Sequence, residues 1–260
     1  DALPISLAPQ PVPNFLVNVD TTQSLAVRSR VHTPVVFDEP ERFTRLGMKQ
    51  EREVLDYVSS SAGGNASLEY LNQVAHSADE ASQLVRDAWA KYKTPIDYGI
   101  LPAQLPKVAA CIAAGVPARI YYLAFRNNAF DTHVQQPDLH QRLLSYMADA
   151  IHGFQRDLER LGVAERVSTM IFSEFGRRAP ENTNGGTDHG AANNMFMVGS
   201  KVRGGHYGQP VSLTTLDEGD NLIYTTDFRR VYATAIDNWL QPGTAKAVLK
   251  GEFETLPIFG

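Results

Sequence analysis

The pattern of apolar and polar positions divides the chain near residue 100. Before that point, short apolar runs at 15–19 and 33–37 stand among prolines, which predicts short strands between turns. Between about 48 and 92, apolar residues recur three and four positions apart, which predicts helices with one buried face. A Ser- and Gly-rich loop is expected at 59–67 between these helices. Residues 1–100 are therefore expected to form an irregular and helical part.

From residue 101 onward, segments with the helical spacing of apolar residues alternate with short apolar runs that are typical of strands. The predicted helices are 105–114, 138–161 and 227–240, and the predicted strands are 119–125, 167–172 and 195–198. Gly115 and Gly162 stand where two of these helices should end. The run 119–125 is almost continuously apolar, as expected of a strand buried on both faces.

This alternation predicts an α/β fold, with a mainly parallel sheet covered by helices. We expect a single domain over 1–260. In it, 101–240 forms the α/β core that carries the functional site, and 241–260 forms a tail.

Composition narrows the class of protein. The 260 residues contain 24 Lys and Arg against 29 Asp and Glu, and the basic residues are scattered, which argues against nucleic acid as a partner. Cys111 is the single cysteine, so no internal disulfide forms and the fold depends on its core or on a metal. No stretch approaches the ~18 uncharged apolar residues of a membrane span.

Polar residues follow two of the predicted strands, at the sheet end where ligands bind in parallel sheets. Asp131 and His133 lie two positions apart, so an extended backbone directs both side chains to one side. A carboxylate and an imidazole placed in this way suit Zn, Mn or Fe. The plainer alternative is a polar loop in which Asp131 caps a turn.

Two later segments carry further chemistry. Glu174 and Arg177 follow the strand 167–172, where charges rarely stand without a partner or a metal; an ion pair between them is the simpler alternative. Asp188 and His189 lie between glycines that permit a close backbone approach, or else form an ordinary surface turn. Taken together, five side chains offer nitrogen and oxygen ligands for one or two divalent ions. They are Asp131, His133, Glu174, Asp188 and His189. Zn, Mn and Fe fit this set best, followed by Mg and Ca.

The same residues carry a family resemblance. Five motifs occur in a fixed order: Phe130-Asp-Thr-His133, Ser173-Glu-Phe-Gly-Arg177, Gly186-Thr-Asp-His-Gly190, Gly204-Gly-His-Tyr-Gly208 and Thr226-Asp-Phe-Arg-Arg-Val-Tyr-Ala233. Over about 100–240 the chain resembles the bacterial family of domain of unknown function 1501, regarded as sulfatase-like within the alkaline phosphatase superfamily.

This resemblance implies an alkaline phosphatase-like fold and metal-dependent hydrolysis of a small-molecule phosphate or sulfate ester. It also implies a periplasmic or exported protein. By order, Asp131, His133 and His189 would share one metal, and Arg177 would hold the oxyanion. For a second metal, one alignment uses Glu174, with Phe175 in place of a histidine. The other uses the pair Asp188 and His189.

The chain departs from the superfamily in its first half. The superfamily's nucleophile and one metal aspartate come from an early strand that we do not find here. Ser59, Ser60 and Ser61 lie in a loop without such a strand before it. Since the chain begins with Asp1, we expect that part of the family's N-terminal region is missing. Two hypotheses follow: a metal-dependent ester hydrolase, or a catalytically inactive exported binding or scaffold protein on the same fold.

Overall fold

The computed structural model describes residues 8, 10, 12–29, 31–44, 53–54, 57 and 65–260. They form two compact units. Unit 1 comprises Gln10–Pro95 and Ala103–Ala124, and unit 2 comprises Ile96–Pro102 and Phe125–Gly260, with the first nine residues outside these ranges. The predicted serine loop at 59–61 lies outside the described residues.

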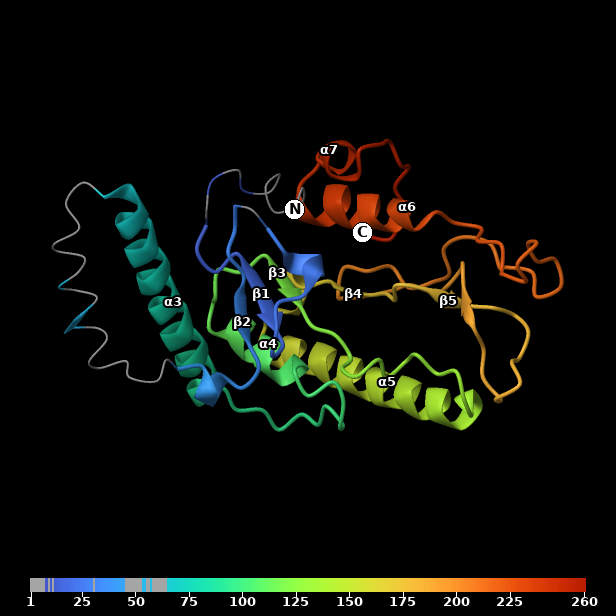
Figure 1. The fold of residues 1–260 in the computed structure, drawn as a ribbon, viewed down its shortest axis with the longest axis horizontal. Helices are drawn as coiled ribbons and strands as arrows, with labels where there is room; N and C mark the ends of the chain where they lie inside the picture. Colours follow the sequence, from blue (N-terminus) through green and yellow to red (C-terminus); the bar gives the residue numbers. More distant parts are fainter. Residues whose placement is uncertain are drawn as a thin grey trace. The chain divides into compact units, whose positions relative to one another are not determined.

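A small parallel sheet forms the centre of unit 1 (Figure 1). Its strands are β2 (Val35–Phe37), β1 (Leu16–Val19) and β3 (Ile120–Tyr122), in that order. β1 is buried along its whole length because it has a parallel neighbour at each edge. The predicted early strands and a parallel sheet are thereby confirmed. β3 is shorter than predicted and half-buried, not buried on both faces.

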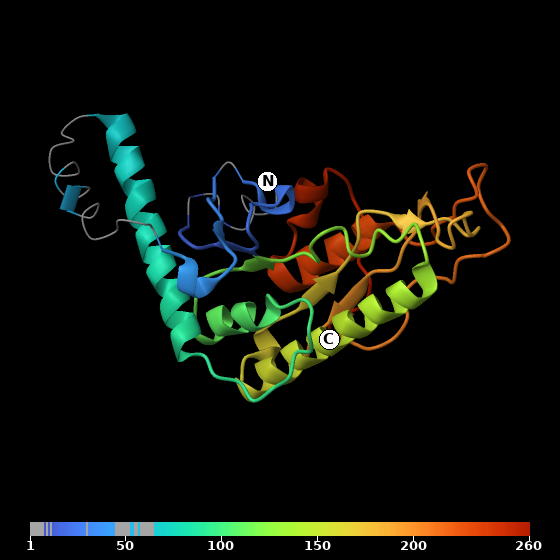
Figure 2. The same cartoon turned by 60° about the horizontal axis from the view of Figure 1, so that its bottom comes forward.

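Two helices complete the regular part of unit 1. They are α3 (Ala66–Lys91) and α4 (Leu105–Ala113), which pack against each other (Figure 2). The Asn65 side chain begins α3 by accepting the backbone N–H groups of the second and third helical residues. Gly115, with φ of +72°, follows the end of α4 as its sequence position predicts. Lys107 Nζ ties α4 to the chain after β2, donating to Asp38 O at 2.7 Å and Glu39 Oε1 at 2.9 Å.

The long helix α5 (Gln136–Arg160) dominates unit 2 and confirms the predicted helix 138–161. The apolar residues along this helix are only partly buried: Leu143, Phe154 and Leu158 are in the core, whereas Leu139 is exposed. Tyr98 donates its hydroxyl to the fully buried Asp157 at 2.8 Å, which fixes the segment Ile96–Pro102 on this helix. Gly162, with φ of +71°, ends it.

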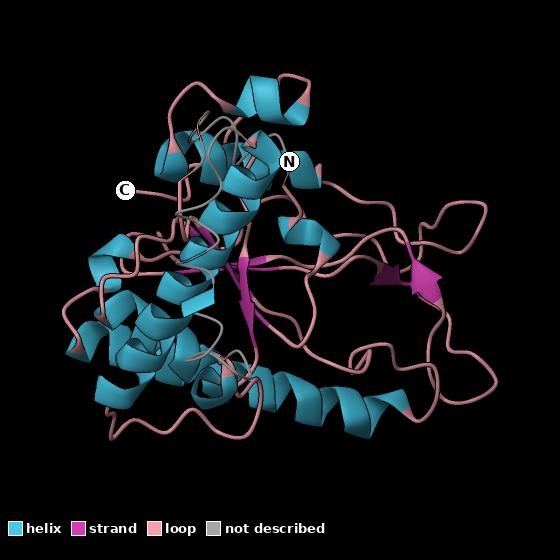
Figure 3. Ribbon diagram, turned by 60° about the vertical axis from the view of Figure 1, so that its left-hand side comes forward, coloured by secondary structure: helices cyan, strands magenta, loops and turns pink. Residues whose placement is uncertain are grey.

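The strands of unit 2 are short and pair in antiparallel fashion. Figure 3 draws the strands of the chain in magenta, among long pink loops. β4 (Thr169–Ile171) pairs with β7 (Phe196–Val198), and β5 (Gly176–Arg177) pairs with β6 (His189–Gly190). Strands near 167–172 and 195–198 are confirmed, but their expected parallel arrangement is wrong. The connection between them holds a hairpin instead of the helix that returns the chain in a parallel crossover.

The end of the chain packs into a small core of its own. It consists of α6 (Phe228–Ala235), the π-helical turn η4 (Ile236–Leu240) and α7 (Ala245–Leu249), shown in red in Figure 1. The predicted helix 227–240 is confirmed as an α-helix up to residue 235. Asp227 caps α6, accepting the Arg229 N–H at 2.9 Å.

The short 3₁₀ turns are η1 (Leu25–Val27), η2 (Pro40–Arg42) and η3 (Ala164–Arg166). None of the described helices has the length and apolar character to cross a bilayer. The whole is a mixed helix-and-sheet fold with a small parallel sheet.

Candidate metal centre

Three ligand-type atoms meet in unit 2. Asp131 Oδ1 lies 2.8 Å from His189 Nε2 and 3.0 Å from His133 Nε2, and the two Nε2 atoms are 3.0 Å apart. Asp131 and His133 come from the loop before α5, and His189 begins β6. Within the described part of the chain, this triad is the one group of His, Cys, Asp and Glu side chains whose ligand atoms are close enough to share an ion.

Protons alone satisfy this triangle poorly. If both Nε2 atoms carry hydrogen, they compete for one carboxylate oxygen and face each other as two donors. If one is bare, its lone pair faces that oxygen. A divalent cation would satisfy all three atoms, and ligands about 2.1 Å from a tetrahedral Zn lie about 3.4 Å apart, so a small opening suffices. The donor set is therefore suited to a divalent ion.

The Asp131 carboxylate of the triad is stabilised in its charged form, and all three side chains are accessible. The His189 hydrogen bond holds the pKa of the Asp131 carboxyl below its usual range, with help from the charges of both histidines and from Arg177. The side chains of Asp131, His133 and His189 are 29%, 41% and 47% exposed, so an outside ligand can reach them.

Arg177 joins the two segments that carry the triad. Its guanidinium donates to Thr187 O at 2.7 Å, to Phe130 O at 2.8 Å and to Asp131 Oδ1 at 3.1 Å. The predicted oxyanion role of Arg177 stays a prediction. In the structure, the Arg177 side chain supports the Asp131 carboxylate and the backbones of the two segments that carry the triad.

Phe175 supports the other side of the triad. Its ring stacks on the His189 imidazole, with centroids 3.6 Å apart and planes 16° apart. The Arg177 guanidinium lies 5.2 Å from the centre of the same ring. One alignment would place a metal-binding histidine at position 175. In the structure, Phe175 occupies this position and supports the His189 ring by stacking on it.

The other two predicted ligands lie outside the triad. Asp188 Oδ1 is 3.4 Å from His133 Nδ1, the nitrogen that does not face Asp131. Glu174 is exposed and accepts a hydrogen bond from Ser173 Oγ at 3.2 Å. The structure thus brings together three of the five predicted ligands, and the ligand roles of Asp188 and Glu174 stay predictions.

Sequence reasoning did not single out Asn182. Its side-chain nitrogen donates to His133 O at 3.0 Å, and its oxygen accepts the N–H groups of Asn184 and Gly186. The Asn182 amide therefore links the loop 182–186 to the loop that carries His133. The available signal was the composition of 182–186, because Asn and Gly are the residues that build such side-chain-stabilised turns.

Glycines allow the loops to touch. A Cβ on Gly186 would overlap the backbone of His133, and a Cβ on Gly190 would overlap the backbone of Arg177. Neither residue needs a positive φ. Close backbone approach, one of the two roles considered for these glycines, is what the fold uses.

Comparison with known proteins places this arrangement in a family. The family model described as "Protein of unknown function (DUF1501)" matches residues 21–229, which include the complete triad. The chain belongs to this family. No curated protein and no solved structure matches the chain. The DUF1501 resemblance is confirmed, and the family description assigns no reaction.

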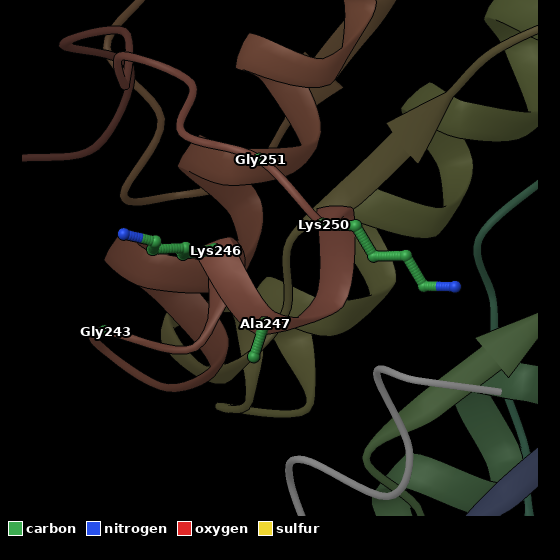
Figure 4. Close-up of a pocket in the computed structure, with 5 residues that line it drawn as sticks. All are labelled: Gly243, Lys246, Ala247, Lys250 and Gly251. Atoms are coloured by element: carbon green, nitrogen blue, oxygen red, sulfur yellow. The ribbon is translucent and has the colours of Figure 1, made fainter.

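This DUF1501 protein has a hollow of about 580 Å³ against α7. Gly243, Lys246, Ala247, Lys250 and Gly251 line it, without any member of the triad. Figure 4 shows the two lysine side chains extending in opposite directions. Lys246 is paired with Glu252, so the hollow does not focus positive charge on a ligand.

Proposed function

We propose that this chain binds a divalent metal ion through Asp131, His133 and His189 and hydrolyses a phosphate or sulfate ester of a small molecule there. The observation that carries the proposal is the convergence of three ligand atoms within 4.8 Å of one another. Zn, Mn and Fe suit this donor set, with Mg and Ca as less fitting ions. Sulfatase-like chemistry and export belong to the same proposal and follow from the family resemblance.

The number of ligands favours catalysis over a purely structural metal. Structural zinc sites are closed by four protein ligands, whereas catalytic sites have three and an open position. The partial exposure of all three side chains provides access to that position. When bound, the ion would polarise the ester oxygen and stabilise the charge that develops on it. Arg177 and Phe175 would meanwhile keep Asp131 and His189 in place.

Metal content tests the binding step. The chain is purified without added metal or chelator, and Zn, Mn and Fe are measured per chain. We expect about one ion per chain, lost in His133→Ala and in His189→Ala. His152→Ala is the matched control, because His152 is exposed on α5 outside the triad. Unchanged metal content in both triad variants overturns the site.

A second function is favoured by one observation. In the described part of the chain, no Ser or Thr hydroxyl is hydrogen-bonded to a triad side chain. The two neighbouring hydroxyls, of Thr132 and Thr187, both bond to Gln136. An inactive exported binding or scaffold protein would bind the metal without turnover. Aryl phosphates and sulfates with Mn or Zn separate the two functions. Hydrolysis that disappears in His133→Ala supports the enzyme, and metal binding without hydrolysis supports the scaffold.

A further inference from the structure

We infer that Asp188 is a positioning residue: its carboxylate orients the His133 ring so that Nε2 faces the ion, and it is not itself a ligand. The inference rests on the proposed metal site. Asp188 Oδ1 lies 3.4 Å from Nδ1 of His133, whereas Nε2 of the same ring lies 3.0 Å from Asp131 Oδ1. The two nitrogens of one imidazole thus face two different carboxylates.

This arrangement determines the tautomer. A ring that offers the Nε2 lone pair to a cation carries its hydrogen on Nδ1. Asp188 is the acceptor placed beside that hydrogen. A movement of about 0.4 Å brings the pair to the usual N–H···O distance. A carboxylate in this position fixes the ring and raises its basicity as a ligand.

The local fold holds Asp188 in this place. Its carbonyl accepts the Arg178 N–H at 3.0 Å, which keeps the residue in the β5–β6 hairpin. Asn182 Nδ2 lies 3.4 Å from Asp188 Oδ1 and donates to His133 O at 3.0 Å. One amide therefore contacts both the carboxylate and the backbone of the histidine it orients. A rotation of the carboxylate toward the triad would break its contact with Asn182 Nδ2.

The second histidine is positioned by different chemistry. His189 is stacked on Phe175, and the described structure shows no carboxylate at its Nδ1. The charge of Asp188 should therefore act on His133 alone. Because Asp188 faces only one of the two histidines, the inference can be tested by replacing Asp188 with asparagine, which removes the charge and keeps the shape of the side chain.

The test uses Asp188→Asn and Asp188→Ala in the full chain. Asp138→Asn is the matched control, since Asp138 is an exposed carboxylate in the first turn of α5. Zinc affinity is measured by competition with a chromophoric chelator. We expect both Asp188 variants to weaken zinc binding about 10- to 100-fold with unchanged stoichiometry, and the control to bind like the wild type. Unchanged affinity in both Asp188 variants overturns the inference.

Two spectroscopic readouts separate positioning from ligation and from simple loss of fold. X-ray absorption of the zinc-loaded protein should give the same first coordination shell in the wild type and in Asp188→Asn; loss of an oxygen ligand in the variant overturns the positioning role. Long-range proton–nitrogen correlation spectra of the metal-free protein should show His133 with hydrogen on Nδ1, and a mixture of tautomers in Asp188→Ala. If the wild type binds no metal, the proposed function fails. The tautomer spectra still decide the role of Asp188, because a His133 tautomer that is the same in both proteins contradicts it.

Discussion

The two units of the molecule hold their key residues by different means. In unit 1, β1 lies between two parallel strands, so regular backbone pairing and burial fix its residues. In unit 2, the triad stands on a loop and a two-residue strand. There, side chains that bond to backbone carbonyls replace the strand ladder, and glycines let the loops touch. The difference shows that the geometry of the candidate metal centre depends on loop contacts more than on the sheet, and we expect the units to respond differently to matched substitutions.

The largest difference should come from a pair of glycines. Gly186→Ala forces a Cβ into the backbone of His133, so the loops must separate and metal binding should be lost. Gly115→Ala in unit 1 meets open space and only strains a residue at φ of +72°, which costs about 1–2 kcal/mol. Metal content and denaturant unfolding are measured for both. Normal metal binding by Gly186→Ala would show that the loop contact is dispensable.

The next difference should come from two cations, the half-buried Arg177 in unit 2 and the buried Lys107 in unit 1. Arg177→Lys removes the planar fork that reaches Thr187 O, Phe130 O and Asp131 together, and an ammonium cannot replace it. We expect metal affinity to fall at least about tenfold, in the range seen when groups supporting a metal ligand are lost.

Lys107→Met is the counterpart in unit 1. It removes the hydrogen bond that Lys107 Nζ donates to the Asp38 carbonyl, which should lower the free energy of unfolding by about 1–3 kcal/mol and leave metal affinity unchanged. Chelator competition and urea unfolding, applied to both variants, separate affinity from stability. A loss of stability without a loss of affinity in Arg177→Lys would contradict the proposed support of the triad.

The sequence predicts the elements of this fold better than their partners. The helix 138–161 is recognisable because its apolar period is long and Gly162 ends it, and the strand at 15–19 is short but strongly apolar. Which strand pairs with which depends on the connections. The spacing of apolar residues in 167–172 and 195–198 does not contain this information, so the predicted parallel arrangement was wrong and β4 and β7 are antiparallel.

The same limit applies to the site. Asp131 and His133 were found by residue type and by their position after a predicted strand, and His189 was found by its place between glycines. The different position of Asp188 depends on which nitrogen of His133 it faces, a matter of side-chain direction that a motif does not contain. The sequence did not show that Phe175 supports His189, and it did not single out Asn182. An aromatic ring and an amide have many ordinary uses, and only the distances to His189 and His133 reveal these two roles.

The smallest effect concerns titration, in which the units also differ. In unit 2 the pKa of Asp131 is lowered by its hydrogen bond from His189, whereas in unit 1 burial raises the pKa of the Cys111 thiol to about 12 from 9.0. The folded state of unit 1 thus binds the thiol proton more tightly than the unfolded state does. The stability that this provides is complete below pH 9 and is lost as the pH rises from 9 to 12.

Raising the pH from 8 to 10 should therefore cost the wild type about 1.4 kcal/mol that Cys111→Ala does not lose. Urea unfolding of both proteins at the two pH values measures this difference, and the titration of tyrosines and lysines cancels because both proteins share it. Cys111 is 1% exposed, so the native thiol should also react with a thiol reagent at pH 8 only as fast as unit 1 opens. An equal loss of stability in the two proteins would mean that the thiol already ionises in the folded state, and the interior of unit 1 would then be less well packed around α4 than its burial indicates.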